Sequence, residues 1–188
     1  MIKLEVYILS TKEKIVESAK NLLITNGFHN MNVSDISHEA GFGKGTFYTY
    51  FKSKNELIGY FANSILDDMI TELEKLNYNS NQSETLFQII EIIFENNRKN
   101  SEIIKALFHS YMGTSNLNEW ENMYRKFYSC IEKLLFEEYS KETLIKTQTV
   151  VGMIEYSAEQ GYIFLNESDE HIKKRKAVVY ELSKNIQL

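Results

Sequence analysis

The 188-residue sequence has no proline, a single cysteine and no long apolar run. Average proline usage of about 5% would give roughly nine prolines. Apolar residues instead recur at spacings of three and four through most of the chain, which favours helices joined by short loops. The lone Cys130 excludes an internal disulfide, and no cysteine and histidine cluster has metal-site spacing. We therefore predict an all-α protein that carries no metal or other cofactor.

Membrane-spanning and catalytic patterns are also missing from the sequence. No apolar run reaches the ~18 residues that a transmembrane helix requires. Residues 1–10 are interrupted by Glu5 and are too short for a secretory signal. There is no nucleophile elbow, phosphate-binding loop or supported pair of carboxylates. We expect a soluble cytoplasmic protein that is not an enzyme.

Arginine is absent from the first 60 residues, which hold seven lysines and six acids and so carry a net charge of about +1. The remainder has fourteen bases and twenty acids, which gives about −6 and accounts for the total of −5. Residues 41–54 contain three lysines (Lys44, Lys52 and Lys54) and no acid. A local positive strip on an acidic protein predicts an anionic partner.

Two short predicted helices flank a glycine-containing turn in this region. The first begins at Asn32 and ends before Gly41, and the second begins after Gly43. This arrangement is typical of a helix-turn-helix. At about 100° per residue, Phe47 and Phe51 point to one side of the second helix. The opposite face is small and polar, and it consists of Gly45, Thr46, Tyr48 and Thr49.

This pattern resembles the DNA-binding domain of the TetR family, the tetracycline-repressor-like regulators. The matching residues run from about Thr11 to Leu57, and they include Val33, Asp35-Ile36, Ala40-Gly41, Lys44-Gly45-Thr46-Phe47-Tyr48, Tyr50-Phe51, Lys54 and Leu57. Gly43 departs from the pattern, because the family usually has a serine or a similar capping residue there. The resemblance implies a three-helix DNA-binding domain at residues 1–57 and a helical regulatory and dimerisation domain at residues 58–188, with about nine helices in all. The fourth helix, from residue 53 to about Leu76, would link the two.

The resemblance also implies two groups of DNA contacts. Phosphate contacts are expected from Tyr48, Tyr50 and Lys54, with Ser34 as a weaker candidate. Base contacts are expected from Lys44, Gly45, Thr46 and Thr49. Because this domain has no arginine, it cannot make the common bidentate contact from arginine to guanine. We expect specificity to come from lysine, hydroxyl groups, thymine methyl contacts and DNA shape.

Aromatic and methionine side chains are frequent in the C-terminal two thirds, where the resemblance implies an effector pocket. The candidate lining residues are Phe94, Phe108, Tyr111, Met112, Trp120, Tyr124, Phe127, Met153 and Tyr156. Glu155 and His109 could orient a polar group of the ligand. Each of these side chains could instead pack the core, but together they would suit a small lipophilic or aromatic effector.

Two apolar helical patterns late in the chain could pack internally, whereas the resemblance implies that they form a two-fold dimer interface. The interface candidates are Val151, Ile154, Ala158, Tyr162, Val179 and Leu182, with Gly152 and Gly161 allowing a close approach. A homodimer presents two reading heads, and two heads one DNA turn apart match a palindrome.

The resulting hypothesis is a homodimeric repressor that binds a double-stranded DNA operator and is released by a small-molecule effector. Two alternatives remain at this stage. One is a TetR-like fold controlled by a protein partner. The other is a helical small-molecule-binding protein that does not bind DNA.

Overall fold

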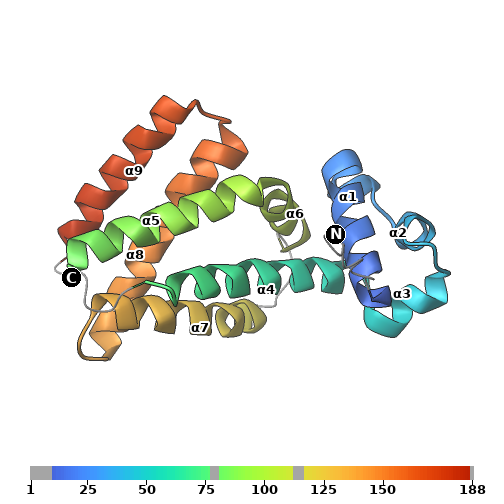
Figure 1. Cartoon of the computed structure of the whole chain (residues 1–188), viewed down its shortest axis with the longest axis horizontal. Coiled ribbons are helices and arrows are strands. Elements are labelled where there is room, and N and C mark those ends of the chain that lie inside the picture. Colours follow the sequence, from blue (N-terminus) through green and yellow to red (C-terminus); the bar gives the residue numbers. More distant parts are fainter. Residues whose placement is uncertain (1–9, 77–80, 112–116, 187–188) are drawn as a thin grey trace, which may run out of the picture.

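The computed structural model describes residues 10–76, 81–111 and 117–186, with the backbone alone at 109–111 and 117–120. Within these ranges the chain forms nine α-helices and one π-helical turn, and it has no strand. The predicted all-α class is confirmed. Figure 1 shows a small N-terminal group of helices connected by the long helix α4 to a larger C-terminal bundle.

The first two helices each begin after a residue whose side chain caps the helix. Helix α1 (Thr11–Asn30) starts after Ser10, whose hydroxyl accepts from the Glu13 N–H at 3.3 Å while its own N–H donates to the Glu13 carboxylate at 2.6 Å. Gly27 interrupts this helix with a φ of 75°. Helix α2 (Val33–Glu39) starts after Asn32, whose side chain accepts from the Asp35 N–H at 3.0 Å.

Helix α3 (Lys44–Tyr50) follows a tight turn that needs glycine. Gly41 has a φ of 79°, which other residues adopt only with strain. At the N-cap, Gly43 provides no side-chain hydrogen bond, as its lack of a side chain predicts. Phe47 and Phe51 are buried and pack α3 against the rest of the group. The opposite face of α3 is thereby turned outward.

Helix α4 (Lys54–Leu73) is a rod of about 30 Å at 1.5 Å per residue. It ends three residues before the predicted Leu76. Ser53 caps it by accepting from the Glu56 N–H at 3.1 Å, while the Glu56 carboxylate accepts from the Lys52 N–H. Its apolar stripe is buried along the full length, at Leu57, Phe61, Ile65, Met69 and Leu73.

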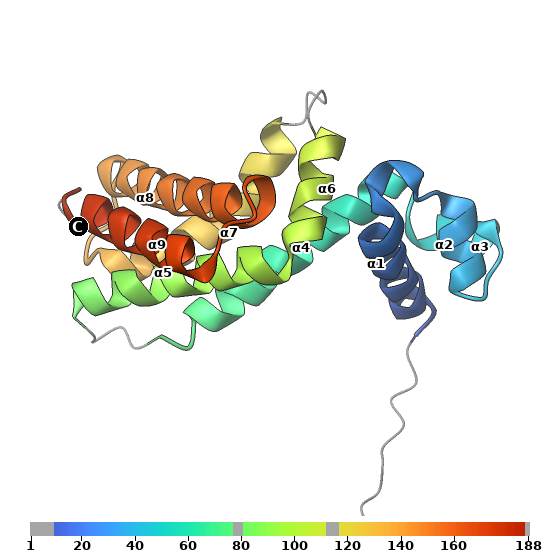
Figure 2. The same cartoon turned by 90° about the horizontal axis from the view of Figure 1, so that it is seen from above.

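The remaining helices form the C-terminal bundle together with α4 (Figures 1 and 2). They are α5 (Gln82–Lys99), α6 (Ser101–Tyr111), α7 (Leu117–Leu135), α8 (Lys141–Glu159), the π-turn η1 (Gln160–Phe164) and α9 (Asp169–Lys184). Helix α4 packs against α5, α6 and α7, whereas α8 packs against α5, α7 and α9. Helix α6 also contacts α1, so the N-terminal group is held by the bundle through both α4 and α6.

The structure also bears on membrane spans, the single cysteine and metal sites. No helix in the described part of the chain is both long and apolar enough to cross a membrane. Cys130 is a buried thiol, and burial raises its pKa. The same residues contain no group of three or more histidine, cysteine, aspartate or glutamate side chains placed to hold a metal ion.

Candidate functional site

The outward face of α3 is open to solvent over its whole length. Gly45, Tyr48 and Thr49 are exposed, and Thr46 is half-buried. A Cβ atom added at Gly45 would meet nothing within 4 Å, so this face can approach another surface closely. The Thr49 hydroxyl donates to the Gly45 carbonyl at 3.1 Å, which leaves its oxygen lone pairs to accept hydrogen bonds from outside.

Two tyrosines flank this face. Tyr48 is 54% exposed and Tyr50 is 41% exposed. The ring of Tyr48 lies edge-on to the buried ring of Phe47, with 5.5 Å between centroids, and this contact limits its movement. The Tyr48 hydroxyl therefore projects from a ring that is held in place by Phe47.

The exposed cations around α3 are Lys44 and Lys52. Neither ammonium has a hydrogen bond or ion pair within the described ranges. Ser34 is exposed in the first turn of α2. The arrangement provides positive charge and hydroxyl donors around a narrow polar helix, which suits a phosphate-lined groove.

Lys54 is placed differently from the predicted phosphate contact. Its ammonium donates to the carbonyls of Phe28 at 2.8 Å and Met31 at 2.9 Å, and it lies 4.1 Å from the centroid of the Phe28 ring. Burial lowers its pKa. Two of the three ammonium N–H bonds therefore join the start of α4 to the end of α1, and we infer that Lys54 positions these two helices.

Replacing Lys54 with methionine is expected to destabilise the N-terminal group by roughly 2 kcal/mol, because two partly buried carbonyls lose a charged donor. Any DNA affinity should fall, while the slope of log affinity against log salt stays unchanged. Lys44→Ala is the matched comparison, because loss of a phosphate contact flattens that slope by about 1. If Lys54→Met instead flattens the slope of log affinity against log salt, Lys54 contacts a phosphate.

A second cluster, of aromatic and acidic side chains, lies between α7 and α8. The rings of Tyr124, Phe127 and Tyr128 are mutual neighbours, with centroids 5.4 to 6.3 Å apart. The Tyr124 hydroxyl donates to the Glu155 carboxylate at 3.1 Å. Tyr124, Phe127 and Glu155, predicted separately, are thus brought together.

Two glutamates in this cluster, Glu155 and Glu159, have raised pKa values. Burial, reinforced by the charge of Glu159, raises the pKa of Glu155 to about 8, against a smaller opposing effect of the Tyr124 hydroxyl. Burial raises the pKa of Glu159 to about 7. Burial also raises the pKa of Tyr124, and it raises that of Tyr128 to about 12. Near neutral pH the cluster consequently holds a protonated Glu155 beside two neutral phenols.

The other predicted pocket residues are dispersed. Phe94 is buried against Tyr162, and Phe108 packs on Phe164. Met153 is half-buried, whereas Tyr156 is 64% exposed, and a place for Tyr156 in a ligand cavity stays a prediction. The side chains of four further candidates lie outside the described residues, namely His109, Tyr111, Met112 and Trp120.

The predicted interface residues on α8 and α9 are mostly internal. Val151, Ile154, Ala158 and Val179 are buried within the protomer, and Tyr162 is half-buried. The four buried side chains already pack against neighbouring helices of the same protomer. Of the predicted set, Leu182 alone is exposed, at 54%.

Large apolar side chains are exposed on α8 and α9, namely Ile145, Tyr156, Val178 and Leu182, and they are called the apolar patch below. Of these four, the sequence analysis proposed only Leu182 for an interface. Gly152 lies on the exposed face of α8, and a Cβ there would meet nothing within 4 Å. Gly161 instead serves internal packing, because a Cβ there would lie 2.5 Å from Ile172 Cδ1. In the sequence, the patch corresponds to apolar residues on each helix that lie beside the stripe buried in the core.

Comparison with known proteins assigns both parts of the chain. The family model of bacterial regulatory proteins, tetR family, matches residues 15–60. The model of the tetracyclin repressor-like C-terminal domain matches residues 86–186.

Individual relatives agree with these matches. The uncharacterized HTH-type transcriptional regulator YvdT of Bacillus subtilis is 26% identical over 180 residues, which cover 92% of each chain. The dhaKLM operon transcriptional activator DhaS of Lactococcus lactis is 27% identical over 134 residues, or 70% of this chain and 64% of that one. The structure of FadR from Bacillus subtilis with stearoyl-CoA has a TM-score of 0.68 and 20% identity, covering 90% of this chain and 96% of that chain. At this identity the likeness shows a shared fold.

Proposed function

This chain belongs to the tetR family of bacterial regulatory proteins, and we propose that it is a cytoplasmic, homodimeric, ligand-responsive repressor of a palindromic operator. Its family and relatives are transcriptional regulators and not enzymes. The observation that carries the proposal is the exposed polar face of α3, held outward by the buried Phe47 and Phe51.

In the proposed complex α3 enters the major groove. Lys44, Gly45, Thr46 and Thr49 face the base edges, while Tyr48, Tyr50, Lys52 and Ser34 hold phosphates. Lys54 fixes α1 to α4 and so sets the angle of the reading head. We divide the chain functionally near residue 57, with DNA binding before it and regulation and dimerisation after it.

The proposed dimer is formed by the exposed apolar patch of α8 and α9. Ile145, Tyr156, Val178 and Leu182 would meet the same residues of a second copy across a two-fold axis. Two reading heads spaced about 34 to 36 Å apart would then fit successive turns of one DNA face.

The proposed effector is a small lipophilic or aromatic molecule bound beside the α7–α8 cluster. The aromatic rings of Tyr124, Phe127 and Tyr128 supply the apolar contacts, and Glu155 supplies a hydrogen bond. Helix α4 packs against α7 and also against α6, which contacts α1, so a change near α7 can alter the angle of the reading head. The effector releases DNA only to the extent that it prefers the released conformation.

A gel shift on the DNA upstream of the gene tests this proposal. We expect a shifted band at low salt, a footprint with two half-sites, and loss of the band on adding the effector. Acyl-CoA thioesters belong in the screen because the related FadR structure holds stearoyl-CoA. Raised expression from the same promoter after deletion of the gene supports repression, whereas lowered expression indicates an activator, as DhaS is named. Failure to shift any upstream fragment contradicts DNA binding.

A further inference from the structure

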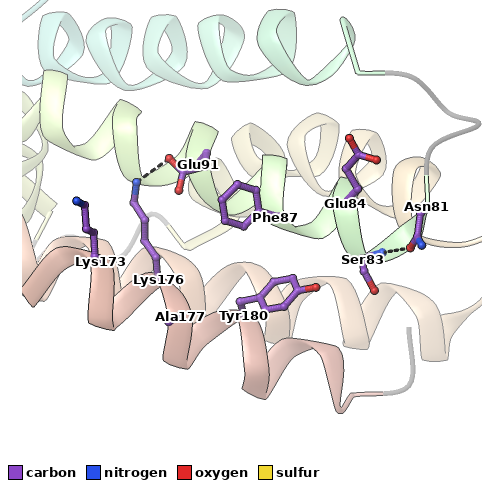
Figure 3. A pocket seen from close by; sticks show the side chains of 9 residues that line it. All are labelled: Asn81, Ser83, Glu84, Phe87, Glu91, Lys173, Lys176, Ala177 and Tyr180. Carbon is purple, nitrogen blue, oxygen red and sulfur yellow. Dashed lines mark hydrogen bonds and ion pairs between the residues drawn. The ribbon is translucent and has the colours of Figure 1, made fainter. Parts of the chain in front are cut away.

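A groove of about 860 Å³ lies between α5 and α9, on the side of α9 that faces α5 (Figure 3). It is separate from α3 and from the α7–α8 cluster, and its volume falls within the range of small-molecule sites. Side chains from α5 form one wall and side chains from α9 form the other. Nothing in the proposed regulator function accounts for it.

The middle of the groove is apolar. Phe87 is 50% exposed, although a phenylalanine ring on the surface loses the free energy that burial would provide. Its ring meets that of Tyr180 edge-on, with centroids 6.3 Å apart, and Ala177 lies beside them on α9 (Figure 3). A chain or ring of carbon atoms laid along this surface would cover the Phe87 ring.

One end of the groove is positively charged. Lys173 and Lys176 extend from α9 toward α5, and Figure 3 shows both ammonium groups at the same end. Lys176 pairs with Glu91 at 2.7 Å, whereas no acid in the described ranges pairs with Lys173. Two ammonium groups and one carboxylate leave a charge of about +1 at this end. Glu84 lies toward the opposite end, and its carboxylate is turned away from α9 in Figure 3.

The groove stays open when the proposed dimer forms. At about 100° per residue, Lys173, Lys176, Ala177 and Tyr180 occupy one flank of the buried stripe of α9. The dimer patch residues Val178 and Leu182 occupy the other flank. A second copy placed on the patch therefore leaves the groove accessible, and the groove itself exists in a single protomer.

We propose that this groove binds an amphipathic anion. Its carboxylate or phosphate head lies at Lys173 and Lys176, and its apolar part extends along Ala177, Phe87 and Tyr180. The distance from Lys173 to Tyr180 along α9 is about 10 Å at 1.5 Å per residue, which suits a medium-length chain. Charge complementarity sets the orientation, and burial of the Phe87 ring supplies the affinity.

Calorimetric titration of the full chain with sodium decanoate, below its micelle concentration and without DNA, tests the proposal. Lys173→Glu is expected to weaken binding about tenfold or more by reversing the free charge, and Phe87→Ser about fivefold by removing the apolar contact. Both residues lie on the surface, so both variants should fold, which circular dichroism checks. Lys133→Glu, an exposed charge reversal on α7, is the control and should bind as the unmodified chain does.

Decyltrimethylammonium carries the same chain with the opposite charge and is expected to bind at least about tenfold more weakly than decanoate. Equal affinity for the two, absence of decanoate binding, or unchanged affinity in both groove variants would overturn the proposal. Because DNA is absent from the titration, these results are independent of whether the operator proposal holds.

Discussion

Replacing Gly45 with glutamate is expected to lower DNA affinity by about 100-fold or more while leaving the protein folded. Gly45 is exposed on the outward face of α3, and a Cβ there meets nothing within 4 Å, so the substitution causes no internal clash. Gly45 lies in the first turn of α3, where a carboxylate interacts favourably with the helix dipole, so the variant should stay folded. The same substitution brings a carboxylate against the base edges and phosphates, where both its volume and its charge oppose binding.

Fluorescence anisotropy at a fixed salt concentration, with the fragment identified by gel shift, measures this effect. Gly45→Ala separates the two causes, because it adds volume without charge. If the backbone approaches DNA closely at this position, Gly45→Ala should lose an intermediate share of the affinity. Thermal unfolding should show both variants at least as stable as the unmodified chain. Unchanged DNA affinity in Gly45→Glu would show that the outward face of α3 does not contact DNA.

The N-terminal group could be predicted closely because its signals are local. The caps at Ser10 and Asn32 and the positive φ values at Gly27 and Gly41 depend on residues within four positions of one another. Lys54 could not be placed in this way. Its carbonyl partners at Phe28 and Met31 are 26 and 23 residues away in the sequence, so its role depends on how α1 meets α4.

The C-terminal half could be predicted as helices but not as sites. Glu155 and Tyr156 are adjacent in sequence, yet one lies partly buried beside Tyr124 and the other projects into solvent. About 100° of helix rotation separates them, and only the neighbouring helices decide which face is covered. The same limit applies to Val151 and Ile154, whose apolar character fits a core and a dimer interface equally well. The groove at Phe87 was missed because neither α5 nor α9 alone forms it.

Replacing Glu155 with glutamine is expected to stabilise the protein at pH 8.5 and to change it little at pH 5. The pKa of Glu155 is about 8 in the folded chain, against an ordinary value of 4.5. Between these two values the folded protein binds more protons than the unfolded chain, so the free energy of unfolding falls as pH rises through this window. Glu159, with a pKa of about 7, acts in the same direction. The glutamine amide still accepts a hydrogen bond from the Tyr124 hydroxyl. Because it is neutral, it avoids the free-energy cost of burying a charged carboxylate.

We expect the gain at pH 8.5 to be roughly 2 kcal/mol, or about 5 °C in Tm for a chain of this length. Thermal unfolding at the two pH values measures it, with the exposed Glu138→Gln as the control. Equal shifts at both pH values would show that folding leaves the pKa of Glu155 near its ordinary value of 4.5.

The expected result also bears on the choice of ligand. A protonated Glu155 beside Tyr124 and Tyr128 offers hydrogen bonds without net charge, so this cluster favours neutral lipophilic effectors, whereas Lys173 and Lys176 in the α5–α9 groove favour anions.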